Sequence, residues 1–194
     1  QSRIGADALN LTGPQKYFIG RTEHVVDPDS YLLINEGRKF RTVLNDSRPN
    51  VMVTLAFKVG LAESILLSYD RSADLLGNFY AKGKRAEFIE KSYRLDPMLK
   101  NLIHQSMVID AKAATEDFQY LMEIILEHII ARQLNVQREV NTLQGTRYDT
   151  RVELYKRLHK AKDFIESNFA QNISVNEVAA HACLSSYHFK GLYK

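Results

Sequence analysis

Short apolar runs separated by turn residues occupy the first third of the chain. Between Tyr17 and Ser68 the runs are about four to seven residues long, and Asp, Asn, Pro and Gly are frequent between them. This pattern predicts an antiparallel meander or partial barrel. A loose arm over residues 1–16 should precede it, because Gly13-Pro14 signals a turn. The expected strands are residues 17–19, 24–26, 31–34, 40–44 and 51–57.

Helical periodicity replaces the strand pattern towards the middle of the chain. Residues 61–66 are a candidate first helical turn, and residues 86–93 are a candidate short helix. Asp96-Pro97 then supplies an N-cap residue and a first-turn proline, so a helix should run from there to about residue 110. Helices are therefore expected to dominate the second half of the chain.

The longest expected helix, residues 115–143, has a wide apolar face. Ile124, Leu126 and Ile130 widen this face beyond a simple seam. Such a face either packs wholly within the chain or leaves a strip for a second copy, and both readings stay open. The second reading predicts a homodimer through the 115–143 helix. The other apolar positions on this face are Phe118, Leu121, Met122, Ile125, Ile129, Val136 and Val140.

A break and a further amphipathic helix follow. Gln144-Gly145-Thr146-Arg147 interrupts the long helix and is the best linker candidate. The next helix, residues 151–168, should be the scaffold on which the last elements pack. Its apolar face consists of Tyr155, Leu158, Ala161, Ile165 and Phe169.

Two helix starts lie close together near residue 194. Ser174 with Glu177 three positions later forms a capping box, and Ser185 is a second cap residue. Between the two expected helices only Ala182-Cys183-Leu184 is left for a turn. This spacing predicts a helix-turn-helix. Each cap is flanked by an apolar pair for a hydrophobic staple, Ile173 with Val178 and Leu184 with Phe189.

Small residues and one cysteine surround this turn. Ala179, Ala180 and Ala182 are small enough to let the two helices cross closely. Cys183 is the one cysteine of the chain, so an internal disulfide is excluded, and we expect it to be buried in the turn. A single reduced cysteine is typical of the cytoplasm, which is the expected location.

Composition narrows the class of protein. With 45% hydrophobic and 25% charged residues, the chain belongs among soluble globular proteins. It contains no membrane-length apolar run and no secretory signal pattern, so no membrane partner is expected. The net charge of +3 is concentrated in residues 151–194, which hold seven basic and four acidic groups. A basic terminal segment suits phosphate contact.

No pattern in the chain indicates an enzyme. Gly-rich phosphate loops, G-x-S-x-G and H-E-x-x-H are all absent from the sequence. The six histidines are scattered over unlike elements without metal-ligand spacing. We therefore predict no catalytic residues, no metal site and no cofactor.

The end of the chain carries a family pattern. Residues 158–169 and 173–194 include A-x-x-A-x-L-S-x-x-H-F from Ala179 to Phe189. This stretch resembles the start of the DNA-binding domain of AraC-type transcriptional regulators. Residues 26–37 look like the strand and turn of that family's cupin-like effector-binding domain.

The resemblance implies a set of DNA contacts. The helix beginning at Ser185 would lie in the major groove, with Tyr187 and Lys190 facing base edges. The next position commonly carries Arg in the family, but here it is Gly191, which removes a bidentate guanine contact. The predicted DNA-binding residues are Ser174, Ser185, Ser186, Tyr187, Lys190 and Lys194.

The predicted organisation is α+β with two domains. Residues 1–145 form a cupin-like effector-binding and dimerisation domain, with strands over about 17–68 and helices over about 69–143. Residues 146–194 form a three-helix DNA-binding domain from which the family's second helix-turn-helix is missing. The leading hypothesis is a ligand-responsive bacterial regulator that binds sequence-specific DNA and an unknown small-molecule effector. The alternative is an effector-binding and dimerisation module that modulates full-length regulators.

Overall fold

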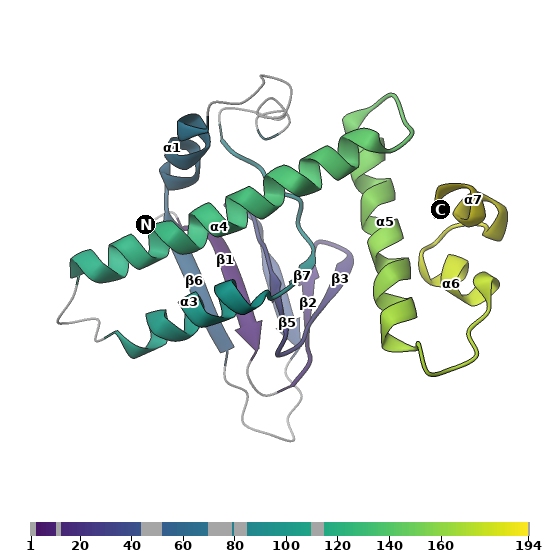
Figure 1. The fold of residues 1–194 in the computed structure, drawn as a ribbon, viewed down its shortest axis with the longest axis horizontal. Coiled ribbons are helices and arrows are strands. Elements are labelled where there is room, and N and C mark those ends of the chain that lie inside the picture. Colours follow the sequence, from purple (N-terminus) through teal and green to yellow (C-terminus); the bar gives the residue numbers. More distant parts are fainter. Residues whose placement is uncertain are drawn as a thin grey trace. The chain divides into compact units, whose positions relative to one another are not determined.

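The structure is a computed structural model that describes residues 3–10, 13–43, 52–69, 79, 85–109 and 115–193. It is α+β, as predicted, with small antiparallel sheets followed by helices (Figure 1). The chain divides into two compact units, Gln1–Asn135 and Val136–Lys194, and the division falls inside a continuous helix. The predicted domain boundary lies further along the chain, after residue 145, and stays a prediction.

Strands of the first unit form two antiparallel sheets within the described residues. One sheet has the order β6-β1-β4-β7 and the other the order β3-β2-β5. The predicted strands at residues 17–19, 24–26, 31–34 and 40–44 are confirmed with shifts at their ends, as is the one at 51–57. The bounds are β1 (Arg3–Asn10), β2 (Gln15–Ile19), β3 (Thr22–Val26), β4 (Ser30–Leu32), β5 (Phe40–Val43), β6 (Met52–Lys58) and β7 (Ser92–Arg94).

The expectation of a loose N-terminal arm is wrong, because β1 lies inside a sheet. It pairs with β6 from Arg3↔Lys58 to Asn10↔Met52, and with β4 at Ala8↔Leu32. Ala, Asp, Asn and Gly are poor strand formers, so local propensity concealed this strand. Hydrogen bonding to strands on both sides determines its conformation instead.

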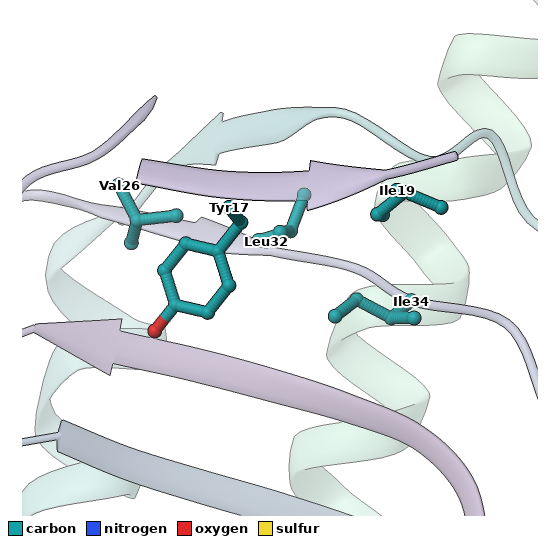
Figure 2. Packing of buried hydrophobic residues seen from close by; sticks show 5 residues of the cluster. All are labelled: Tyr17, Ile19, Val26, Leu32 and Ile34. Carbon is teal, nitrogen blue, oxygen red and sulfur yellow. The ribbon is translucent and has the colours of Figure 1, made fainter. Parts of the chain in front are cut away.

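The sheets enclose a small apolar core. Alternate residues of β2 are buried, which places Gln15, Tyr17 and Ile19 on one face of the strand. Figure 2 shows the buried side chains gathered on one side of β2. The Tyr17 hydroxyl donates to Met52 Sδ at 2.7 Å, and burial raises the pKa of Tyr17. The members of this core are Tyr17, Ile19, Val26, Leu32 and Ile34.

Residues 86–93 do not form the predicted short helix. They contain no helical residue and lead into β7, where Tyr93 pairs with Tyr31. The Asn35 side chain forms hydrogen bonds with both backbone polar groups of Phe88. Phe88 N–H donates to Asn35 Oδ1, and Asn35 Nδ2 donates to Phe88 O, each at 2.8 Å. The Asn35 N–H donates in turn to the buried Glu90 carboxylate at 3.0 Å. These tertiary bonds replace the helical ladder and override local propensity.

Among the residues that the structure describes, three helices accompany the sheets of the first unit. They are α1 (Leu61–Ser68), α3 (Pro97–Val108) and α4 (Thr115–Thr142), so the predicted helices at 61–66, 97–110 and 115–143 are confirmed. In Figure 1 α3 and α4 lie in front of the strands. Asp96 caps α3 as expected, accepting from Leu99 N–H at 2.9 Å.

Asp96 also joins α3 to α4. Its carboxylate contacts His128 Nε2 at 2.7 Å and Arg132 Nη1 at 2.6 Å. Burial would raise the pKa of Asp96, but these partners and the Leu99 N–H outweigh burial and hold it below its ordinary value. The same side chain therefore caps the start of α3 and fixes that helix to α4.

The apolar face of α4 is core. Ile125, Leu126, Ile129, Ile130 and Leu134 are almost completely buried within the chain. The residues that widen the face are thus used internally, apart from the half-buried Ile124. The homodimer through 115–143 stays a prediction.

The second unit consists of the last turns of α4 and three helices. These are α5 (Tyr148–Ser167), α6 (Val175–His181) and α7 (Ser186–Leu192), as predicted. Phe169, expected on the apolar face of α5, is 84% exposed, because α5 ends at Ser167 and the chain leaves the helical direction there. Among the described helices, none combines the length and apolarity needed to cross a membrane.

Candidate nucleic-acid interface

A compact apolar cluster holds α6 and α7 on α5. Ala161 of α5 is completely buried against residues from both short helices. The predicted staple residues Ile173, Val178, Leu184 and Phe189 all belong to this cluster or pack on its edge. The cluster comprises Ala161, Val178, Ala179, Ala182 and Phe189, with Leu158, Phe164, Ile165, Ile173 and Leu184 around it.

The start of α6 is fixed by the predicted capping box. Glu177 N–H donates to Ser174 Oγ at 3.2 Å, and Ser174 N–H donates to Glu177 Oε2 at 2.7 Å. The backbone and hydroxyl bonds from Ser174 hold the pKa of Glu177 below its ordinary value. Ser174 is exposed, and its hydroxyl also donates to Glu177 Oε2, so both its polar groups already have partners.

The turn between α6 and α7 is a Schellman motif. Leu184 N–H donates to Ala179 O at 2.8 Å, and Cys183 N–H donates to Ala180 O at 3.0 Å. Cys183 has φ = 56°, in the left-handed region. Its side chain is exposed, so the expectation that it is buried is wrong. Ala180 is exposed too, and close packing of the two helices relies on Ala179 and Ala182.

The start of α7 is fixed by Ser185 and by a link to α6. His188 N–H donates to Ser185 Oγ at 3.2 Å, as the sequence predicts. Ser186 Oγ donates to Asn176 Oδ1 at 2.6 Å, which joins the first turns of the two helices. The first turns of α6 and α7 are therefore held by specific polar contacts.

The predicted contact residues fall into two groups. Tyr187 and Lys190 lie on α7 with exposed side chains, Tyr187 at 91%. Ser174, Ser185 and Ser186 lie at helix starts and take part in capping or inter-helix bonds. Lys194 lies outside the described residues. The DNA contacts of all six stay predictions.

Gly191 follows Lys190 on the exposed side of α7. A Cβ added there would meet no atom within 4 Å. The position is thus open, and its lack of a side chain is not imposed by packing.

Two residues in this unit escaped the sequence reasoning. Arg157 of α5 donates from Nη1 to Cys183 O at 3.1 Å and from Nε to Glu153 Oε1 at 2.9 Å. The i, i+4 spacing of Glu153 and Arg157 on a helix predicts an ion pair between them. Nothing in the sequence pattern pointed to the contact of Arg157 with the turn, or to Asn176 as the partner of Ser186.

A groove of about 490 Å³ runs beside this arrangement within the second unit. Its polar lining includes Glu153, Arg157 and His188. In the part of the chain that the structure describes, no group of three His, Cys, Asp or Glu side chains is placed to hold a metal ion. The lining residues are Gln144, Asp149, Thr150, Glu153, Leu154, Arg157, Leu184, His188 and Leu192.

Comparison with solved structures finds a similar fold. The apo K231A form of ToxT from Vibrio cholerae strain SCE256 matches 97% of the chain with a TM-score of 0.50 and 10% sequence identity. The fold of the chain is similar to that of the matched part of ToxT. The resemblance of the sequence to AraC-type regulators is thus confirmed at the level of fold.

The chain matches only part of apo ToxT, and two further solved structures match with lower TM-scores. It spans 65% of the apo ToxT chain. The AraC-like transcriptional activator CuxR is 11% identical over 97% of this chain and 59% of its own, with a TM-score of 0.43. Wild-type ToxT bound to an unsaturated fatty acid is 10% identical over 98% and 82%, with a TM-score of 0.46. No protein-family model and no curated protein matches the sequence.

Proposed function

We propose that this protein is a transcriptional regulator that binds duplex DNA through a helix-turn-helix made of α6 and α7. The observation that carries the proposal is the presentation of Tyr187 and Lys190 on a short helix whose other face is anchored by Phe189. In a helix-turn-helix the second helix lies in the major groove and offers its exposed side chains to base edges. The ToxT-like fold supports the same assignment.

The polar groups at the helix starts suit contact with the DNA backbone. Ser185 lies at the start of α7, where a hydroxyl can donate to a phosphate oxygen, whereas the hydroxyl of Ser186 already donates to Asn176. The net positive charge of residues 151–194 adds a sequence-independent attraction to the duplex. Lys190 supplies a cation on α7 itself. Phosphate contacts would fix the position of the protein along the duplex. Tyr187 and Lys190 would make the contacts with base edges.

The first unit is proposed to be a cupin-like domain that binds a small-molecule effector. Gln15 supports a polar ligand group there, because its side chain is 2% exposed and its Nε2 has no hydrogen-bond partner among the residues that the structure describes. A buried amide without a partner is unfavourable, so a ligand or water that accepts from it would be stabilised. The Tyr17 hydroxyl lies within hydrogen-bond distance of both Gln15 Oε1 and Met52 Sδ, so these two residues lie beside Gln15.

The predicted homodimer would place the α7 helices of two copies on one duplex.

Fluorescence anisotropy of the whole chain tests DNA binding. The labelled duplexes are the upstream region of the encoding gene and a generic sequence of equal length, each measured at several salt concentrations. Affinity should fall steeply with salt, and Lys190→Ala should reduce the slope of log K against log salt by about one. Arg21→Ala removes the same charge from a turn of the first unit and should leave the slope unchanged. Absence of salt-dependent binding to both duplexes would remove the DNA role.

Gly191 favours one alternative. A helix that lacks this side chain reads bases poorly, so the chain could act chiefly by pairing with full-length regulators. Sedimentation of the protein mixed with such a regulator would then show a heterodimer. A strictly monomeric chain in that mixture excludes this second function.

A further inference from the structure

The turn between α6 and α7 contains a residue in an unfavourable conformation. Cys183 has φ = 56°, and it is the one non-glycine residue with positive φ among those the structure describes. Left-handed backbone brings Cβ close to the following carbonyl in an L-residue, so glycine usually occupies this position of a Schellman motif. A cysteine there needs compensation from its surroundings.

Arg157 supplies a contact to that residue. Its Nη1 donates to Cys183 O at 3.1 Å, a bond across from α5 to the turn. The Schellman bonds use the N–H groups of Cys183 and Leu184, so they leave the Cys183 carbonyl for this guanidinium. A bond from a charged donor is stronger than a neutral one.

The guanidinium is itself held in place. Arg157 Nε donates to Glu153 Oε1 at 2.9 Å, one helical turn earlier on α5. Two separate N–H groups of one rigid plane are thus engaged, one on the helix and one on the turn. The Arg157 side chain is 38% exposed, so most of it lies against the protein.

We propose that Arg157 is a positioning residue that holds the Cys183 turn in its left-handed conformation and so sets the direction of α7. Tyr187 and Lys190 follow the turn directly, and a change in backbone angle at Cys183 would carry both away from the duplex. The inference rests on the proposed DNA-binding function for its affinity readout. The conformation of the turn can be measured without DNA.

A double-mutant cycle between Arg157 and Cys183 tests the proposal. The full chain is prepared as wild type, Arg157→Ala, Cys183→Gly and the double variant, and DNA affinity is measured by anisotropy. Arg157→Ala should weaken binding about tenfold in the wild-type background and less than about threefold in the Cys183→Gly background, because glycine adopts this conformation without help. Equal losses in the two backgrounds would overturn the proposal.

Salt dependence separates positioning from direct contact. The Arg157→Ala loss should leave the slope of log K against log salt unchanged, whereas a lost phosphate contact would lower it by about one. Arg157→Lys keeps the charge but not the planar fork, so it should behave like Arg157→Ala. A reduced slope in Arg157→Ala, or full affinity in Arg157→Lys, contradicts the positioning role.

Hydrogen exchange decides the matter without DNA. The Leu184 amide is bonded to Ala179 O across the turn. Arg157→Ala should speed its exchange at least about fivefold in the Cys183 background and leave it unchanged after Cys183→Gly. If the wild type fails to bind DNA but shows this coupling, the proposed function falls and the positioning role stands. Unchanged exchange in Arg157→Ala refutes the role itself.

Discussion

Gly191 leaves open space next to Lys190, one of the side chains that α7 exposes. Replacing it with arginine should strengthen DNA binding, because the new side chain meets no neighbour and can reach a base edge or a phosphate. The expected gain is about 1–3 kcal/mol, or roughly fivefold to 150-fold in affinity. Anisotropy on the upstream duplex measures it.

Gly191→Ala is the matched control for this gain. Alanine improves helix propensity by about 1 kcal/mol without offering a new contact. A gain in Gly191→Arg no larger than that in Gly191→Ala would show that the position does not face the duplex.

Asp96 makes the stability of the first unit depend on acid pH. Its folded pKa lies below the ordinary value of 3.8, so its carboxylate stabilises the fold above that value. The contribution is lost as pH falls through the lower folded pKa. Asp96→Asn keeps a capping side chain but should cost about 1 kcal/mol at neutral pH, and it should flatten the loss of stability below about pH 4.

Urea unfolding followed by far-UV circular dichroism at pH 7 and pH 3 measures this effect. Asp29→Asn is a suitable control, because Asp29 contacts Lys100 at 3.0 Å with both side chains well exposed. Such a surface pair contributes little. Equal responses of the two variants would show that the Asp96 contacts do not stabilise the fold.

At the scale of elements, the capping box should determine the stability of α6. Ser174→Ala removes the acceptor for Glu177 N–H and should cost about 1 kcal/mol in the free energy of unfolding. Ser174→Thr restores the hydroxyl and should recover most of it. Thermal unfolding by circular dichroism compares the three proteins. Weaker DNA binding by Ser174→Ala without any loss of stability would instead indicate a direct phosphate contact.

Elements whose ends are set by neighbouring residues were predictable from sequence. Asp96, Ser174 and Ser185 each cap a helix within three residues of themselves, so local chemistry determines where those helices begin. The segment around Phe88 was not predictable, because its backbone partner, Asn35, is 53 positions away. The strand β1 was not predictable for the same reason, because its conformation depends on pairing with strands that are distant in sequence.

Candidate site residues follow a similar rule. Exposure of Tyr187 and Lys190 could be derived from the apolar spacing of α7, because Phe189 occupies the inward face. The contact of Arg157 with Cys183 depends on how α5 crosses the turn, which no local pattern specifies. Cys183 was misjudged because a small apolar residue in a turn is usually buried, whereas here the left-handed backbone leaves it exposed.

At the scale of the whole molecule, variants on α4 can show whether its apolar face serves folding, dimerisation or both. Ile129 is 1% exposed within the chain, so Ile129→Ala should cost about 2–5 kcal/mol of stability. The loss should be independent of protein concentration, because the cavity opens inside one chain. Tyr120, exposed on the same helix, gives a contrasting variant in Tyr120→Ala, which should leave unfolding almost unchanged.

Thermal unfolding over a hundredfold range of protein concentration distinguishes the two readings. A midpoint that rises with concentration in the wild type and no longer does so in Tyr120→Ala would mean that the exposed side of α4 binds a second copy. The homodimer would then use a surface separate from the core-facing residues of this helix.

The two hydrogen bonds between the Asn35 side chain and the backbone of Phe88 affect the rate at which this segment opens to solvent. In a sheet, opening one amide to solvent requires neighbouring ladder bonds to separate, but here rotation of a single side chain would release both backbone groups of Phe88. The segment can therefore open locally while the sheets stay closed. Its amide should exchange with solvent far sooner than that of Tyr93, which pairs with Tyr31 in a strand only five positions later. Such a difference in exchange rate would place a border between Phe88 and Tyr93, with a segment that opens on its own before it and a paired strand after it.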